Sequence, residues 1–183
     1  MNQAALDIDR TASVTAAAGV ADVVRNAGAA PQFISFAIGD DQYGVDIMAV
    51  REIKGWSDIT HLPRQPDFMR GVLNLRGAIV PIVDLRCRFG QGLTEATQLH
   101  IVIIVQIGSR LVGLLADRVL DIVTFDASQI QPVPRVVQGT RLNFLSGLVT
   151  VEGTLIALID LINLLVSSVD DETERGDHRQ SAF

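Results

Sequence analysis

Residues 71–85 read GVLNLRGAIVPIVDL, and this stretch decides the fold. Two apolar segments with strong strand preference, Val72 to Leu75 and Ala78 to Val83, flank the pair Arg76-Gly77. A glycine at the second position of a two-residue turn supplies the positive φ that such a turn requires. The stretch therefore predicts a tight β-hairpin with Arg76 at its tip.

The same pattern returns 76 residues later, as GLVTVEGTLIALIDL in residues 147–161. Four of the fifteen positions are identical and seven more pair apolar with apolar, and the identities include both glycines and the closing Asp-Leu. Residues 38–53 repeat in the same way as residues 107–122, at an offset of 69. The difference between the offsets, 76 − 69 = 7, places seven extra residues in the Pro-rich stretch 129–141. The chain is thus predicted to contain one β-rich unit twice.

Each unit is predicted to have about five short strands and little helix. Residues 33–38 and 102–107 are the first strands, and each returns through a Gly-containing turn. Closure removes exposed strand edges, so two small β-barrels are the economical arrangement, at about 33–95 and 96–166, with strand exchange left open. Pro81 indicates a strand edge or a bulge. We assign four glycines to structural turns, namely Gly44, Gly77, Gly113 and Gly153.

Composition limits the classes of function. The net charge is −6, so the basic face typical of a nucleic-acid binder is not indicated. A single cysteine excludes a disulfide scaffold, no signal peptide is apparent, and the longest apolar stretch, residues 101–107, is too short to span a bilayer. The segments 1–31 and 167–183, the latter acidic, are predicted to be flexible tails. We expect a cytoplasmic protein with no direct membrane insertion.

No catalytic motif is visible, and neither a metal site nor a cofactor is predicted. Asp84 and Asp160 occupy equivalent positions before short helical segments, which favours helix capping over acid–base chemistry. Cys87 is interpreted as a small apolar residue of the core rather than a reactive thiol. Trp56, the only tryptophan, either fills the junction between the halves or marks an interaction surface.

The duplication provides an internal control, because residues shared by both halves serve the fold. Gly77 is matched by Gly153, but Arg76 is answered by Glu152, a charge reversal at the hairpin tip. A guanidinium at such a tip can bind a partner through two hydrogen bonds, although for a lone arginine a solvated turn charge is the more common case. Residues 46–53 are predicted to make a helical turn before a strand, whereas their counterparts 115–122 suggest one continuous strand.

These segments resemble the family of chemotaxis coupling proteins, CheW. The resemblance rests on IGxxxYGVDIxxVREI in residues 38–53, on GVLNLRGxxxPIVDL in residues 71–85, and on weaker matches over 112–148. It covers about residues 33–166. It implies a mostly β fold of two SH3-like five-stranded barrels packed together with short helices, and no enzymatic activity.

The resemblance also implies two partners, the cytoplasmic tip of methyl-accepting chemoreceptors and the regulatory domain of the histidine kinase CheA. Carried over by motif, the receptor-side or array contacts fall on Val50, Glu52, Gly71, Asn74 and Arg76. Kinase contacts are expected at apolar barrel ends, with no residue assigned, and the protein would be recruited to membrane-associated receptor arrays. The alternatives are an adaptor of the same fold in a parallel chemosensory pathway and a small nucleic-acid-binding barrel.

Overall fold

The computed structural model describes residues 30–134 and 144–166. Its strands are β1 (Gln32–Ile38), β2 (Asp41–Asp46), β3 (Val50–Gly55), β4 (Met69–Leu75), β5 (Ala78–Asp84), β6 (Ile101–Ile107), β7 (Arg110–Ala116), β8 (Arg118–Thr124), β9 (Leu145–Val151) and β10 (Thr154–Ile159). The helices are α2 (Leu85–Arg88) and α3 (Leu161–Val166), with 3-10 turns η2 (Ile47–Ala49) and η3 (Ala127–Gln129). The predicted tails lie outside the described residues, apart from positions 30 and 31.

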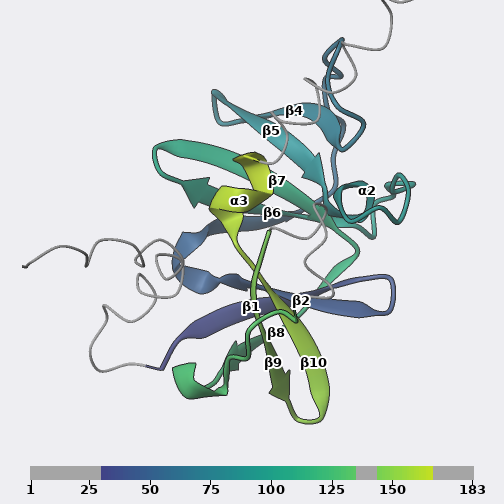
Figure 1. The fold of residues 1–183 in the computed structure, drawn as a ribbon. Helices are drawn as coiled ribbons and strands as arrows, with labels where there is room; N and C mark the ends of the chain where they lie inside the picture. Colours follow the sequence, from purple (N-terminus) through teal and green to yellow (C-terminus); the bar gives the residue numbers. More distant parts are fainter. Residues whose placement is uncertain (1–29, 135–143, 167–183) are drawn as a thin grey trace, which may run out of the picture.

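The strands form two five-stranded sheets, in the orders β8-β1-β2-β10-β9 and β3-β6-β7-β5-β4 (Figure 1). The mostly β fold class with two five-stranded units is confirmed. The expected division at about residue 95 does not describe the sheets, because each sheet takes strands from both halves. Each half places its first hairpin in the sheet that contains the last two strands of the other half. Adjacency in the sequence could not show this, since the chain crosses to the other sheet between β2 and β3.

The duplication relates the two sheets to one another. Replacing each of β1–β5 by its counterpart among β6–β10, and the reverse, converts one strand order into the other. The charge-reversed tips, the capping aspartates and the strand glycines therefore occur once in each sheet, at matching places. Differences between matching places can be read as differences between two copies of the same structure.

Two of the four turn assignments are wrong. Gly44 lies inside β2 and Gly113 inside β7, opposite Leu158 and Ile82 in the parallel neighbours. A Cβ on Gly44 would lie 3.0 Å from Leu158 Cδ2, and one on Gly113 would lie 2.5 Å from Ile82 Cδ1. These glycines are therefore needed because a large side chain of the neighbouring strand crosses over them.

The other two turn assignments are confirmed. Arg76 and Gly77 have φ values of 52° and 91°, and Glu152 and Gly153 have 50° and 81°. Two successive residues with positive φ define the type I′ hairpin turn, which matches the twist of the flanking strands. The two tips therefore have the same backbone, and their charged side chains start from equivalent points.

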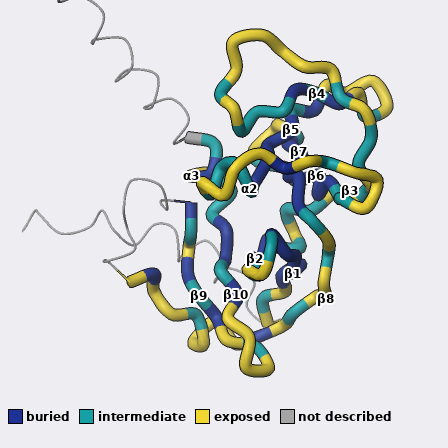
Figure 2. Tube along the Cα trace, turned by 90° about the vertical axis from the view of Figure 1, so that its right-hand side faces the viewer, coloured by how far each residue is buried: buried dark blue, intermediate teal, exposed yellow. Residues whose placement is uncertain are grey.

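Buried positions lie along the strands, and the turns between them are mostly exposed (Figure 2). The apolar side chains form three clusters. One belongs to the sheet that contains β4 and β5, and another to the sheet that contains β9 and β10. The largest joins the two sheets and includes Phe36, Tyr43, Ile103 and Leu114 from β1, β2, β6 and β7. Because these central strands bury side chains on both faces, the barrels share a continuous core rather than a hinge.

The sequence predicted an edge or a bulge at Pro81, and the edge is wrong because β5 is an inner strand. The β4–β5 pairing does have a register shift close by, between Met69 and Gly71. The backbone N–H and C=O of Val72, opposite Pro81, bond instead to Thr60, each at 2.9 Å. The Val72–Pro81 pair is therefore a non-hydrogen-bonded one, so the missing N–H of Pro81 would face β7. The β5–β7 ladder begins only at Ile82, so its pairs do not include Pro81.

Candidate interaction site

The five predicted contact residues all belong to one sheet. Val50 and Glu52 lie on β3, Gly71 and Asn74 on β4, and Arg76 at the tip of the β4–β5 hairpin. β3 and β4 are the two outer strands of this sheet. The structure nevertheless joins them, because Arg76 Nη2 lies 3.3 Å from Glu52 Oε2. The two outer strands come close because the sheet curls into a barrel, and the ion pair joins them.

Arg76 presents most of its guanidinium to solvent, since 82% of its side chain is exposed, against 31% for Glu52. An ion pair as exposed as this contributes at most about 1 kcal/mol to stability. Arg76 can therefore turn toward an acidic partner at little energetic cost. Its position suits recognition more than it suits holding the fold together.

Asn74 acts within the same turn. Its Oδ1 accepts a hydrogen bond of 2.8 Å from the Gly77 backbone N–H, which holds the tip in shape. Val50 is half-buried and packs against the core between the barrels. Only part of its side chain can meet a partner.

Gly71 has a backbone role in the fold. Its φ is 136°, and a Cβ there would lie 2.3 Å from the backbone oxygen of Thr60. The glycine lets the segment at Thr60 approach β4, which it bonds through Val72. Gly71 therefore supports the backbone on which the neighbouring predicted contact residues lie.

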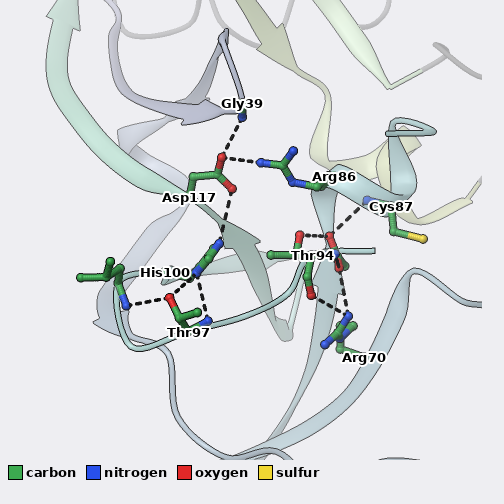
Figure 3. A network of polar contacts seen from close by, with 10 residues as sticks. Gly39, Arg70, Arg86, Cys87, Thr94, Thr97, His100 and Asp117 are labelled. Atoms are coloured by element: carbon green, nitrogen blue, oxygen red, sulfur yellow. Dashed lines mark hydrogen bonds and ion pairs between the residues drawn. The ribbon is translucent and has the colours of Figure 1, made fainter. Parts of the chain in front are cut away.

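A polar network that the sequence did not suggest lies between the sheets (Figure 3). Asp117, between β7 and β8, accepts hydrogen bonds from the backbone N–H of Gly39 (2.7 Å) and from the Arg86 guanidinium. His100 Nε2 lies 3.8 Å from its second oxygen. The prediction of one continuous strand over residues 115–122 is wrong, because Asp117 separates β7 from β8. These partners are far apart in the sequence, so no local pattern indicates them.

Burial alone would raise the pKa of Asp117, but the hydrogen bonds from Gly39 and Arg86 outweigh it and lower that pKa below its ordinary value of 3.8. A lowered pKa in the folded state stabilises the fold above about pH 4, and that contribution is lost as the pH falls further. We therefore expect Asp117→Asn to be less stable than wild type at pH 7 and to approach it in acid. Urea unfolding at pH 7 and below pH 4 measures this, and a constant difference would contradict it.

Asp84 and Asp160 cap helices as predicted. Asp160 Oδ1 accepts from the N–H groups of Ile162 and Asn163, both at 3.0 Å. Asp84 is fully buried and accepts from Cys87 N–H (3.1 Å), Thr94 N–H (2.8 Å) and Thr94 Oγ1 (2.7 Å), and Arg70 Nη1 lies 3.4 Å away. Asp84 therefore also anchors the loop after α2.

Cys87 and Trp56 are both partly buried. Burial, and then the nearby Asp84 carboxylate, raise the pKa of the half-buried Cys87 thiol, which disfavours the reactive thiolate. Trp56 is partly buried against the apolar cluster of its own sheet, and its backbone N–H bonds His100 O at 2.9 Å. It therefore packs within one barrel rather than filling the junction.

Among the residues that the structure describes, no cluster of histidine, cysteine and acidic side chains could hold a metal ion. Over the same residues, no helix is long and apolar enough to cross a membrane. What these residues do offer is an exposed, charged hairpin tip on a rigid β scaffold.

Comparison with known proteins agrees with this description. A family model described as a CheW-like domain matches residues 32–169. The chain is 43% identical over 136 residues to a chemotaxis protein CheW of Rhizobium meliloti, covering 74% of this chain and 88% of the relative. It is 38% identical over 152 residues to the Klebsiella aerogenes chemotaxis protein CheW, covering 82% and 92%.

A solved structure resembles it as well. The crystal structure of the scaffolding protein TtCheW from Thermoanaerobacter tengcongensis matches with a TM-score of 0.67 and 31% identity. The match covers 75% of this chain and 88% of that one. The two strand orders, the paired hairpins and the matched family model lead to one conclusion: the chain belongs to the CheW-like domain family.

Proposed function

We propose that this protein is a non-enzymatic adaptor that couples methyl-accepting chemoreceptors to the histidine kinase CheA. The observation that carries the proposal is the match of residues 32–169 to the CheW-like domain, together with relatives named as chemotaxis proteins CheW. A scaffolding role also suits the duplicated fold with its exposed tips. The adaptor would act in the cytoplasm and be recruited to receptor arrays at the membrane.

The receptor side of the adaptor would use Glu52, Asn74 and Arg76, with Val50 at the start of the same edge strand. Arg76 would supply the recognition charge, and Asn74 and Glu52 would fix where that charge is presented. Gly71 would act indirectly, by allowing Thr60 to approach β4.

Binding to isolated fragments tests the proposal. A helical hairpin with the sequence of a receptor tip and the regulatory domain of CheA, each immobilised separately, should both retain the purified chain. Receptor tips encoded near the gene and tips from unrelated pathways distinguish a general adaptor from one that serves a parallel pathway. Failure to bind any receptor tip and the kinase domain would refute the proposal.

Arg76→Glu should abolish retention by the receptor tip while lowering the melting temperature by no more than a few degrees. The reason is that the equivalent turn of the other sheet carries glutamate, Glu152, with the same backbone conformation. Calorimetry and the binding assay on one preparation measure both quantities.

The double variant Glu52→Arg/Arg76→Glu is the matched control, because it restores an ion pair of opposite polarity. If receptor binding returned with the ion pair, the pair itself would be the functional unit and direct recognition by Arg76 would be excluded. A large melting shift in Arg76→Glu alone would show that Arg76 is structural.

A further inference from the structure

The duplication allows the two sides of the junction between the sheets to be compared. On one side, the Asp117 carboxylate binds the Arg86 guanidinium and the Gly39 backbone N–H. At the repeat offset of 69 residues, the counterpart of Asp117 is Met48. At the offset of 76, the counterpart of Arg86 is Ile162. Arg86 lies on α2 and Ile162 on α3, and these two helices lie on opposite sides of the molecule (Figure 1).

The side opposite the polar network is apolar and exposed. Met48, in η2, is 69% exposed, and Ile162, in the first turn of α3, is 66% exposed. Since Arg86 and Asp117 touch on the first side, the duplication places Met48 and Ile162 near one another on the second. We call these two residues the apolar face. Large apolar side chains that gather on an exposed surface mark an interaction site.

The chain enters the fold beside the apolar face. Phe33, near the start of β1, pairs with Asp46, and Asp46 Oδ1 accepts a hydrogen bond of 2.8 Å from the Met48 backbone N–H. The start of β1 and α3 also lie on the same side of the molecule (Figure 1). The residues that precede β1 are therefore tied to the fold next to the apolar face.

The sequence before β1 contains an apolar stripe at helical spacing. Residues 14–24 read VTAAAGVADVV, and in a helix Ala16, Val20 and Val23 would fall on one side while Asp22 falls on another. A helix of this length is about 16 Å long. Residues 25–31 connect the stripe to β1 and can span about 23 Å when extended. The stripe can therefore reach across the apolar face.

We propose that residues 14–24 dock on the apolar face of the same molecule, with the valine stripe against Met48 and Ile162. A short linker gives the tethered segment an effective concentration in the millimolar range, so a small apolar contact is enough to hold it. The segment 167–183 also begins near this face, after α3. It carries five acidic residues and no aliphatic stripe, so it is a poor match for an apolar surface.

The docked segment would also restrict access to a predicted contact residue. Val50 follows η2 directly, so a segment that covers Met48 also lies over the part of Val50 that is not buried. Val50 is a predicted receptor contact, and this consequence rests on the proposed function. The segment and a receptor tip would then compete, and the chain would limit its own affinity for receptors.

Methyl NMR of the full chain, with ¹³C in the methionine methyl groups, tests docking without receptor or kinase. The chain has three methionines, and Met48→Leu assigns the Met48 signal. With a soluble paramagnetic chelate, the Met48 methyl should relax about threefold or more faster in Val20→Asp than in wild type, if the face is covered for at least two-thirds of the time. The signal of Met69, which packs against the core, serves as the reference.

Ala18→Asp is the matched control, because it adds the same charge on the opposite side of the helix. The Met48 methyl of this variant should relax as in wild type. Equal relaxation of the Met48 methyl in wild type and Val20→Asp would overturn the inference. Protection that increases with protein concentration would overturn it as well, because a second copy would then be the occupant.

The receptor-tip assay separates docking from the proposed adaptor function. Val20→Asp should bind the receptor tip about threefold or more tightly than wild type and Ala18→Asp, since the covered fraction no longer lowers the apparent affinity. Equal affinities of the three proteins would overturn the competition. If none of them binds a receptor tip while Val20→Asp still exposes Met48, the adaptor proposal falls and the docking inference stands.

Discussion

Gly71→Ala should lower the free energy of unfolding by about 4 kcal/mol, the sum of backbone strain of roughly 1–3 and overpacking of roughly 1–3 kcal/mol. The new Cβ would sit 2.3 Å from the Thr60 oxygen, and both groups belong to backbone fixed by two hydrogen bonds. Neither the new Cβ nor the Thr60 oxygen is part of a flexible side chain that could move away. Urea unfolding of the variant should therefore show a midpoint well below that of wild type.

Gly77→Ala is the matched control for Gly71→Ala. Its φ of 91° imposes strain on any side chain, but a Cβ there meets nothing within 4 Å. We expect a loss of about 1–2 kcal/mol at this position. Equal losses of unfolding free energy at both glycines would show that the close approach of Thr60 does not make a side chain at position 71 more costly than one at position 77. A binding defect in a Gly71 variant should be interpreted together with its melting curve, since loss of fold alone would produce it.

Asp84→Ala should be similarly severe, at about 3–5 kcal/mol. The substitution removes one buried carboxylate and leaves two backbone N–H groups and the Thr94 hydroxyl without their acceptor. The Arg70 guanidinium loses its counter-charge and keeps its hydrogen bond to the Thr94 backbone oxygen. The loop after α2 loses its anchor at the same time. Calorimetric melting of the variant, with circular dichroism to check that it folds, measures the effect.

Asp160→Ala tests whether this severity comes from the network or from capping alone. Asp160 occupies the equivalent position and caps α3, but it is not fully buried, and the bonds that its carboxylate accepts from described residues come from its own helix. Loss of such a cap costs about 1 kcal/mol. Comparable losses at the two aspartates would mean that the Thr94 and Arg70 contacts add nothing to stability.

The sequence predicted the features that depend on local pattern. The tips at Arg76-Gly77 and Glu152-Gly153, the helical turn that became η2, and the capping aspartates follow from residue type and spacing alone. The repeat identified which strands correspond. These features need only the chemistry of a few neighbouring residues, so a single sequence is enough.

Features that depend on the partner strand were not predictable in this way. Gly44 and Gly113 looked like turn glycines because what they accommodate, Leu158 and Ile82, comes from strands more than 30 residues away in the sequence. The ion pair of Glu52 with Arg76 joins the two edges of a curled sheet, and the Asp117 network joins four separate segments. Each was missed because its cause lies in how the strands are ordered.

The exchange of hairpins between the sheets has a consequence for how the two halves depend on one another. A single repeat unit, made alone, would hold two strands of one sheet and three of another, and would complete neither. Two such units complete one another by exchanging hairpins, so the duplicated chain has the architecture of a strand-swapped homodimer joined into one chain. Fusion makes assembly independent of concentration. It also frees the two tips to diverge, because in a homodimer every tip would carry the same residue, and arginine could not stand at one end while glutamate stands at the other.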